Sequence, residues 1–542
     1  MNYAELLHLD TGNLSRTAEA VGLVGGRLGD QASELWGTAN IPTTSWDGDD
    51  AEAATGRIRD RVPPLEDTSQ AMLYAQVALL DLVEKLIAAK AHLERARSAI
   101  AGTPLTITPE GVVQVPPGLS QADDERYRRL ADDVATMIRE ALTAANTADA
   151  EAIAALQGVG APGAAPPMSA PATMPGEGWS PQQFKDWWDG LSEPERQYML
   201  ENHPDVIGNA DGIPSMYRDL ANRELLGDAI DRTRSEIDAL KDERADLPGG
   251  PGSEGDRRRL DGEIAALEGR LGGLETIQDR LNAPGTAEYD DRAYLLQIDP
   301  SGDGKAVVAV GNPDTADNVF TSVPGTGASV PTIGGDLGRV DRMVFDANQR
   351  DPEASTAGIL WLGYDAPDAI NNAASTSYAD GAAPALREFQ QGLEVVQGGP
   401  DAANNTLFGH SYGTTVIGHT ATSGGVAADQ MIFVGSPGVG ADHASDMGIG
   451  AENVYATTAP NDIIHVVPDA SWAHNTAPVK EEFGAQVFDT PRYDGSRIAA
   501  HSGYWDDGNP ARTHFASIIT GNGTEVPRGE YHERWYEWRP WN

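Results

Sequence analysis

The clearest chemical signature in the sequence is GHSYG at residues 409–413, which fits the pattern G-x-S-x-G. A short apolar run ends at Phe408, and a stretch suited to a helix follows the motif. A strand that turns at once into a helix is the context of a nucleophile elbow, in which a tight turn lifts a serine hydroxyl clear of the sheet. We therefore predict Ser411 as a nucleophile, with Gly409 and Gly413 present because side chains there would clash. A glycine-rich turn with an incidental serine is the alternative.

A serine hydroxyl attacks efficiently only when a base takes its proton and an acid orients that base. After an elbow these groups follow in the chain order Ser, Asp or Glu, then His. Asp462 comes just after the apolar run 454–457, one strand–helix–strand unit beyond Ser411. An aspartate at the carboxyl end of a strand lies on the edge of the sheet where such sites form. We predict Asp462 as the acid, with Asp442 and Asp469 as weaker alternatives.

The base must be one of eleven histidines. His501, in IAAHSGYW, lies downstream of Asp462 and ahead of the last helical stretch at 510–519. This order predicts His501 as the base, in a loop before that helix. The weaker candidates are His514, which falls inside the predicted helix, His465, which is very close to Asp462, and His410, which is more typical of a packing residue.

Acyl transfer also needs backbone N–H groups that bind the negative oxygen of the transition state. One is predicted to be the N–H of Tyr412, directly after Ser411. The other is predicted in the loop PGTG at 324–327, which follows an apolar run. Gly325 or Thr326 is the expected donor there, and an ordinary turn is the alternative.

Composition excludes several other classes of function. The chain of 542 residues carries 82 acidic and 39 basic residues, a net charge of −43, which disfavours nucleic acid and anionic membranes as partners. It has no cysteine, no H-E-x-x-H motif and no G-x-G-x-x-G motif that opens a strand–helix unit. We therefore expect no metal and no cofactor. We also expect no transmembrane segment and no Sec signal peptide, which leaves a cytoplasmic protein or one exported by another route.

Eight short apolar runs beyond about residue 290 predict the strands of one sheet. Helical connectors separate the later runs, as in a mostly parallel, doubly wound sheet with helices on both faces. The fold class is therefore α/β, preceded by an all-α helical-bundle domain. The runs are Tyr294–Ile298, Ala306–Val310, Asn318–Val323, Gly358–Leu362, Asn405–Phe408, Gln430–Val434, Val454–Thr457 and Gln486–Phe488.

Composition and periodicity divide the chain further. A charged helical hairpin is predicted at 222–283, either packed on the catalytic domain or capping its active site. We expect a helical domain with a small β-hairpin at 1–156, an Ala/Pro/Gly linker at 157–178, a helical segment at 179–289, the catalytic domain at 290–527 and a Trp-rich tail at 528–542.

Residues 179–520 resemble an actinobacterial family of α/β hydrolases long catalogued as a domain of unknown function. The matching segments are ENHPDVIGNADGIP, TSVPGTGA, WLGYDAP, LFGHSYGTT, FVGSPGVG, APNDII and HSGYW. Members are identified as serine hydrolases, and their substrates are generally unassigned. The resemblance implies a triad of Ser411, Asp462 and His501, the same residues that the spacing predicts.

The N-terminal part resembles the W-x-G helical-hairpin proteins of type VII secretion, because Trp-Asp-Gly at 46–48 lies between two helical stretches. That resemblance implies export by this route and pairing with another helical hairpin. The usual export tag is a tyrosine followed four residues later by an acid. Tyr74 and Tyr127 are followed at that distance by Ala78 and Ala131, so a partner would have to supply the tag.

Together these features predict a serine hydrolase that cleaves carboxylic esters through an acyl-enzyme. Acyl transfer to an acceptor other than water, and peptide cleavage, use the same triad. The alternative hypothesis outside enzymes is a non-catalytic protein that acts in secretion or binds a partner.

Overall fold

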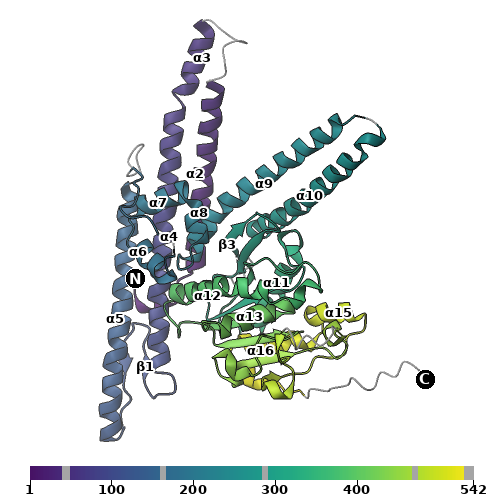
Figure 1. The fold of residues 1–542 in the computed structure, drawn as a ribbon. Coiled ribbons are helices and arrows are strands. Elements are labelled where there is room, and N and C mark those ends of the chain that lie inside the picture. Colours follow the sequence, from purple (N-terminus) through teal and green to yellow (C-terminus); the bar gives the residue numbers. More distant parts are fainter. Residues whose placement is uncertain are drawn as a thin grey trace, which may run out of the picture. The chain divides into compact units, whose positions relative to one another are not determined.

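The computed structural model describes residues 1–39, 49–158, 167–176, 178–248, 250–283, 291–466 and 474–529. They form two compact units (Figure 1). The helical unit contains the described residues of Met1–Thr173 and Leu191–Met199, and the sheet unit those of Met174–Gly190 and Leu200–Asn542. The segment boundaries given above stay predictions. The Trp-Asp-Gly motif at 46–48 and the tail beyond residue 529 lie outside the described residues.

Long helices make up most of the helical unit, as the apolar periodicity predicts. Ser69 Oγ donates a hydrogen bond to the carbonyl of Gly25 at 2.7 Å, while Gly22 faces Gln76. From Gly25 to Gly22 the residue number falls in α2, while the contacted residue rises from Ser69 to Gln76 in α4. The two helices are therefore antiparallel. The helices are α1 (Tyr3–Leu7), α2 (Thr11–Ala39), α3 (Asp49–Arg59), α4 (Val62–Ala99) and α5 (Gln121–Gly158).

The core of this unit lies mainly between α4 and α5. Leu86 and Leu93 of α4 and Val134 and Ile138 of α5 are buried there, at spacings that place each pair on one helix face. Two short antiparallel strands, β1 (Thr106–Ile107) and β2 (Val113–Gln114), form the predicted β-hairpin between these helices.

A buried ion pair joins helix α7 (Glu193–Asn202) to α4 in the helical unit. Arg196 Nη1 lies 2.5 Å from Asp81 Oδ1, and both side chains are buried. Lys85 Nζ lies 2.7 Å from the other oxygen of Asp81. Because an unpaired buried carboxylate is costly, these contacts explain why residues 191–199 belong to the helical unit.

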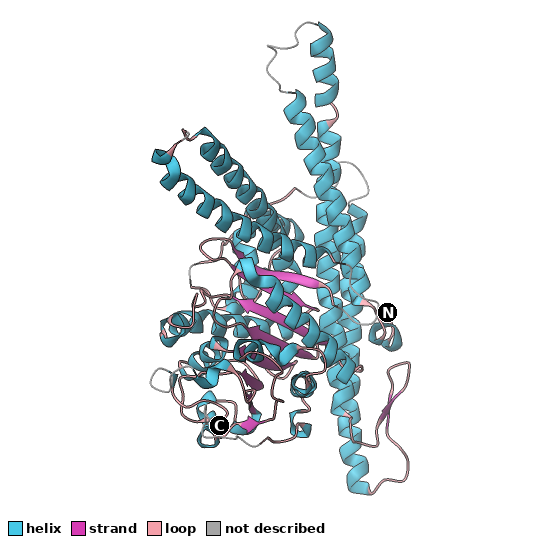
Figure 2. Cartoon of the chain, turned by 90° about the vertical axis from the view of Figure 1, so that its right-hand side faces the viewer, coloured by secondary structure: helices cyan, strands magenta, loops and turns pink. Residues whose placement is uncertain are grey.

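The sheet unit contains one eight-stranded sheet with the order β10-β9-β8-β7-β5-β6-β4-β3 (Figure 2). All eight predicted runs are strands. The pairs β6–β5, β5–β7, β7–β8, β8–β9 and β9–β10 are parallel. Strand β4 pairs antiparallel with both β3 and β6. The strands are β3 (Ala293–Asp299), β4 (Lys305–Val310), β5 (Asn318–Val323), β6 (Thr356–Leu362), β7 (Asn404–His410), β8 (Gln430–Val434), β9 (Val454–Thr457) and β10 (Gln486–Val487).

The strand order determines where a site can form. The chain steps from β5 to β6 in one direction, then passes back over β5 to β7 and continues outward. Right-handed crossovers therefore put α11 (Ile333–Arg350) on one face, and α12 (Ser377–Gln397) and α13 (Tyr412–Thr422) on the other. The order reverses between β5 and β7, so the loops that follow these strands diverge at their carboxyl ends, where sites form in sheets of this kind. Helix α16 (Pro510–Ile519) packs on α11.

Further helices surround this core. Helix α6 (Pro181–Asp189) packs on α12, and α8 (Pro204–Asn209) packs on α9. The predicted charged hairpin consists of α9 (Ser215–Asp246) and α10 (Glu254–Asn282), with Leu226, Ile230, Leu274 and Ile277 in the core of the sheet unit. Helix α10 also packs on α11 and on the short turn Val330–Thr332. The base of the hairpin is therefore an integral part of this unit.

Two neighbouring glycines of α10 allow a matched test of this packing. A Cβ at Gly273 would lie 2.1 Å from the carbonyl oxygen of Val330, whereas a Cβ at Gly272 meets nothing within 4 Å. Alanine is favoured over glycine inside a helix by about 1 kcal/mol. We expect Gly272→Ala to preserve or raise the free energy of unfolding, and Gly273→Ala to lower it by about 1–3 kcal/mol. Urea unfolding followed by circular dichroism measures both, and equal stability of the two variants would show that α10 does not pack on this turn.

Candidate active site

Ser411 occupies a strained turn between β7 and α13. Its φ is 53° and its ψ is −127°, and among the described non-glycine residues only Asn475 also has a positive φ. Such a conformation persists only where the surroundings hold it in place. The N–H of Ser411 donates to the carbonyl of Val434 in β8 at 2.9 Å. The strand ends at His410 and the helix begins at Tyr412, so the turn is tighter than the expected helix start at Thr414.

The two glycines of the motif permit this turn. A Cβ at Gly413 would lie 2.0 Å from the carbonyl oxygen of Val323, at the end of β5. A Cβ at Gly409 would lie 2.8 Å from the Cα of Thr414. Real Cβ atoms do not approach backbone atoms this closely, so neither position accepts a larger residue without a shift of the backbone.

His501 and Asp462 form a hydrogen-bonded pair. Nδ1 of His501 lies 2.7 Å from Oδ1 of Asp462, whose side chain is fully buried, while the His501 side chain is 16% exposed. A carboxylate accepts only from a protonated nitrogen, so this contact favours the tautomer with its proton on Nδ1 and a free lone pair on Nε2. A Cβ at Gly435, just past β8, would lie 3.1 Å from His501 Nδ1 and 3.2 Å from Asp462 Oδ2. The pair therefore lies beside the carboxyl end of β8, the strand next to β7.

The surroundings of His501 differ from the predicted loop. His501 lies in the last turn of the short helix α15 (Arg497–Ser502). Ser496 caps this helix by accepting a hydrogen bond from the N–H of Ala499 at 3.1 Å. The expectation of a loop was wrong because a capped helix of six residues leaves almost no periodic signal in a sequence.

Tyr504, which no motif predicted as a site residue, donates a further hydrogen bond to the carboxylate of Asp462. Its hydroxyl donates to Asp462 Oδ2 at 2.5 Å and accepts from the N–H of Ala459 at 2.9 Å. The N–H of Ile464 donates to Asp462 Oδ1 at 2.8 Å. Burial, reinforced by the charge of Asp462, raises the pKa of Tyr504 well above its ordinary value, so its phenol remains a donor. The only signal in the sequence was the position of Tyr504 in HSGYW, three residues after His501.

His410, inside the elbow, contacts the backbone of His501. Its Nε2 lies 2.7 Å from the carbonyl oxygen of His501, a contact that requires a proton on Nε2. The two imidazole rings are 4.8 Å apart, and the Trp505 ring lies 5.0 Å from His410. Burial lowers the pKa of His410 well below its usual value, and electrostatic interaction with His501 and Arg339 adds to this effect. His410 is therefore a neutral hydrogen-bond donor.

The loop at 324–327 lies directly against the elbow. A Cβ at Gly325 would lie 2.8 Å from Ser411 Cβ and 3.0 Å from the backbone nitrogen of Tyr412. Tyr412 is the first residue of α13, so its N–H has no acceptor within its own helix. This proximity brings Gly325 and the backbone nitrogen of Tyr412 beside the same serine, and their role as oxyanion donors stays a prediction.

The weaker candidates have other surroundings. Asp442 accepts a hydrogen bond from Thr476 Oγ1 at 3.1 Å and is exposed. His465 Nε2 lies 3.1 Å from the carbonyl oxygen of Ala459. His514 lies inside α16, with its ring 5.4 Å from that of Phe488, and Asp469 lies outside the described residues.

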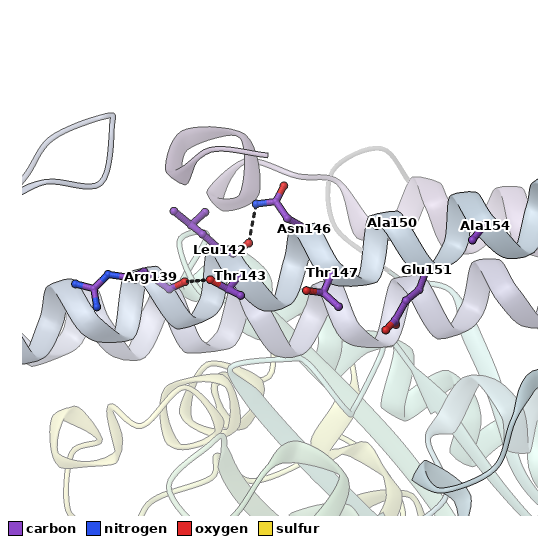
Figure 3. A pocket seen from close by; sticks show the side chains of 8 residues that line it. All are labelled: Arg139, Leu142, Thr143, Asn146, Thr147, Ala150, Glu151 and Ala154. Carbon is purple, nitrogen blue, oxygen red and sulfur yellow. Dashed lines mark hydrogen bonds between the residues drawn. The ribbon is translucent and has the colours of Figure 1, made fainter.

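One surface hollow lies apart from this chemistry. It encloses about 660 Å³ and is lined by residues of α5 alone, from Arg139 to Ala154 (Figure 3). Within the described ranges, no three His, Asp or Glu side chains are grouped to hold a metal ion. No helix in that part of the chain is long and apolar enough to cross a bilayer.

Comparison with known proteins places the chain in a family. A family model described as "Alpha/beta hydrolase" matches residues 299–471. An uncharacterized protein of Mycobacterium bovis is 30% identical over 239 residues, which cover 41% of this chain and 81% of that protein. The chain therefore belongs to the α/β-hydrolase family, and the predicted fold class is confirmed. The link of its N-terminal part to W-x-G proteins stays a prediction.

Other relatives extend the comparison. An uncharacterized protein of Mycobacterium tuberculosis is 30% identical over 403 residues, 68% of this chain, and the chain spans 60% of the length of that relative. Among solved structures, a thermostable esterase from Pseudomonas putida is 12% identical, with a TM-score of 0.27, over 55% of this chain and 97% of the esterase. Carboxyl esterase 2 of Tuber melanosporum is 10% identical, with a TM-score of 0.28, over 45% and 90% of the two chains.

The depressed pKa of His410 predicts a pH dependence of stability. Folded His410 stays neutral, whereas an unfolded histidine takes up a proton below about pH 6.5. Its contribution to stability is therefore fully present above about pH 6.5 and is lost as the pH falls below it, by up to about 1.4 kcal/mol per pH unit. His410→Gln keeps an N–H donor but does not titrate, so its unfolding free energy should fall less steeply.

Urea unfolding of both proteins between about pH 7.5 and pH 5 measures the two slopes. Burial also lowers the pKa values of His474 and His514, but both histidines are present in both proteins, so the difference in slope isolates His410. Parallel pH profiles would mean that folded His410 takes up a proton as readily as an unfolded histidine.

Proposed function

We propose that this protein is a serine hydrolase that cleaves carboxylic esters through a Ser411–His501–Asp462 triad. The observation that supports this most is a convergence at the carboxyl ends of the central strands. A strained serine, a histidine bonded to a buried carboxylate and a glycine-rich loop against the Tyr412 nitrogen all meet there. These three features are the ones that an activated serine nucleophile requires.

The proposed reaction begins when Ser411 Oγ attacks the ester carbonyl carbon while His501 Nε2 accepts the hydroxyl proton. The N–H of Tyr412 and that of Gly325 or Thr326 bind the negative oxygen of the tetrahedral intermediate. The carbon–oxygen bond to the alcohol then breaks, and His501 protonates the leaving oxygen. A water molecule attacks the acyl-enzyme and gives its proton to His501. Collapse of the second intermediate releases the acid and returns the proton to Ser411.

Asp462 acts through His501 in this scheme. Its carboxylate fixes the Nδ1–H tautomer, so that Nε2 is the nitrogen left to face the serine, and it stabilises the imidazolium that forms during each step. Tyr504 and the N–H of Ile464 hold the carboxylate in position. Three donor–acceptor contacts to Asp462 therefore set the orientation of the His501 ring.

We further propose that the helical unit pairs with a second helical-hairpin protein during type VII export. The support is the antiparallel pair of long helices, α2 and α4, on either side of residues 46–48. The pairing would bury apolar side chains that α2 exposes, such as Leu23, Val24 and Trp36.

Steady-state hydrolysis of p-nitrophenyl acetate tests the catalytic assignment. Ser411→Ala and His501→Ala should each lower kcat by a factor of roughly 10⁴ or more, because the nucleophile or its base is lost. Asp462→Asn keeps the shape of the acid but favours the wrong tautomer, and we expect a loss of about 10⁴. Asp442→Asn is the matched control and should retain the wild-type rate. Loss of activity in that control, or full activity of Asp462→Asn, would assign the acid elsewhere.

A further inference from the structure

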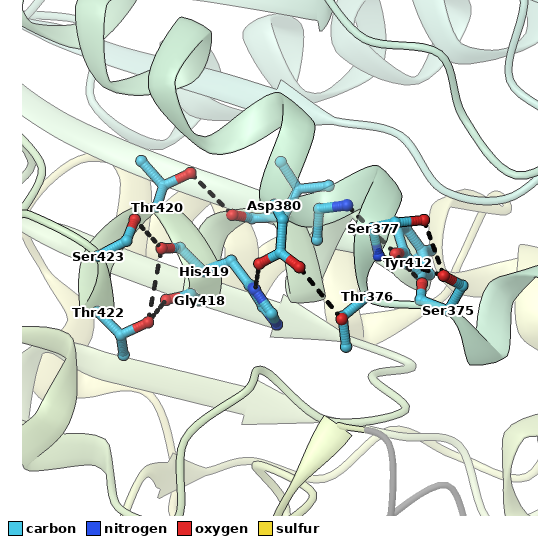
Figure 4. Close-up of polar contacts among 12 residues, drawn as sticks. Ser375, Thr376, Ser377, Asp380, Tyr412, Gly418, His419, Thr420, Thr422 and Ser423 are labelled. Carbon is cyan, nitrogen blue, oxygen red and sulfur yellow. Dashed lines mark hydrogen bonds and ion pairs between the residues drawn. The ribbon is translucent and has the colours of Figure 1, made fainter.

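A second surface hollow is linked to the proposed nucleophile through Tyr412, the residue that follows Ser411. It encloses about 590 Å³ and lies in the segment between β6 and α12. Its lining consists of Asn371, Asn372, Ala374, Ser375, Ser377 and Tyr378. We call it the polar subsite; Figure 4 shows the contacts around Ser375, Ser377 and Tyr412.

The wall of the polar subsite is bonded to the residue after the nucleophile. Tyr412 Oη donates to the carbonyl of Ser375 at 2.5 Å, and burial raises the pKa of Tyr412 to about 12, so this hydroxyl stays protonated. The rings of Tyr378 and Tyr412 meet edge to face, 6.3 Å apart. His474 Nε2 lies 2.7 Å from the carbonyl oxygen of Ala373.

The same segment is also bonded to the loop predicted to bind the oxyanion. Tyr364 Oη donates to the carbonyl of Pro324 at 2.7 Å, and the N–H of Gly327 donates to the carbonyl of Pro367 at 2.8 Å. The segment from β6 to α12 is thus held at one end by the 324–327 loop and at the other by Tyr412. The segment therefore contacts both elements that carry the predicted oxyanion donors, the 324–327 loop and Tyr412.

The chemistry of the lining is neutral and rich in hydrogen-bonding groups. Each asparagine amide offers two N–H donors and a carbonyl acceptor, and neither Asn371 nor Asn372 uses its side chain in a hydrogen bond to another described residue. Ser375 and Ser377 bond to each other through their hydroxyls at 2.8 Å and keep further capacity. Tyr378 adds a half-buried aromatic ring.

Charge around the polar subsite disfavours an ionic ligand. No lining residue is basic, so a carboxylate or phosphate would find no cation to pair with. The neighbouring Asp380 carboxylate lies 2.8 Å from Nδ1 of His419 and accepts from Thr376 Oγ1 at 3.2 Å (Figure 4). This carboxylate is already engaged, and its charge would repel an anion.

We propose that the polar subsite binds the hydroxylated, uncharged part of the substrate, so that the protein cleaves esters of a sugar or polyol. This inference rests on the proposed ester hydrolysis. Amide and hydroxyl groups exchange hydrogen bonds with sugar hydroxyls, and an aromatic ring covers the C–H face of a sugar. An alkyl group in the same place would desolvate the two amides without replacing their hydrogen bonds, so the site would discriminate against it.

The test compares two acetate esters whose alcohols both have six carbons, glucose 6-acetate and hexyl acetate, by pH-stat titration. The full-length protein should show a kcat/KM for glucose 6-acetate about tenfold or more above that for hexyl acetate. Asn372→Leu preserves the size of the side chain and removes its amide, and it should lower this ratio by about tenfold. Asn371→Ala, at an exposed position, is the second variant in case the first does not fold. Asn13→Leu, at an exposed position of the helical unit, is the matched control and should keep the wild-type ratio.

A wild-type preference for hexyl acetate, or an unchanged ratio in both folded variants, overturns the sugar or polyol assignment alone. Failure to hydrolyse either ester or p-nitrophenyl acetate, with a Ser411 that does not react with a fluorophosphonate, overturns the proposed function and this inference with it.

Discussion

The backbone of Ser411, held at a φ of 53° between β7 and α13, is the constraint on which the site depends. A strand that turns into a helix within one residue brings the first turn of α13 against the end of β5, so Gly413 has no room for a Cβ beside Val323. In the same way Gly325 lies so close to Ser411 and to the Tyr412 nitrogen that it has no room for a Cβ. Strand order sets where this happens, because the loops after β5 and β7 diverge at the point where the order reverses.

A second constraint is the buried carboxylate of Asp462. A charge removed from water is tolerated when hydrogen bonds satisfy it, and this one has His501, Tyr504 and the N–H of Ile464 as donors. Two of the three donors come from the stretch HSGYW, so one short segment both carries the base and holds its acid. His410 connects that segment to the elbow through the His501 carbonyl. The serine turn and the histidine segment therefore support each other.

Much of this arrangement could be predicted from sequence, because its signals are local. Every apolar run beyond residue 290 is a strand, and Asp462 and His501, which chain order and the neighbouring elements predict as acid and base, are in hydrogen-bond contact. The antiparallel pairing of β3 and β4 left no mark in their composition, since strands buried on both faces look alike in either direction. The contacts of Tyr504 and His410 were missed for a different reason. They join Asp462 to Tyr504 and His410 to His501 across 42 and 91 residues, and no known motif pairs residues of these types with the acid or with the base.

The most direct test of the central claim is covalent labelling with a fluorophosphonate, read by intact mass and peptide mapping. The elbow and its paired histidine predict one adduct per chain, on Ser411, which is absent in Ser411→Ala and forms far more slowly in His501→Ala. An adduct on another serine, or equal rates of labelling with and without His501, would contradict the account.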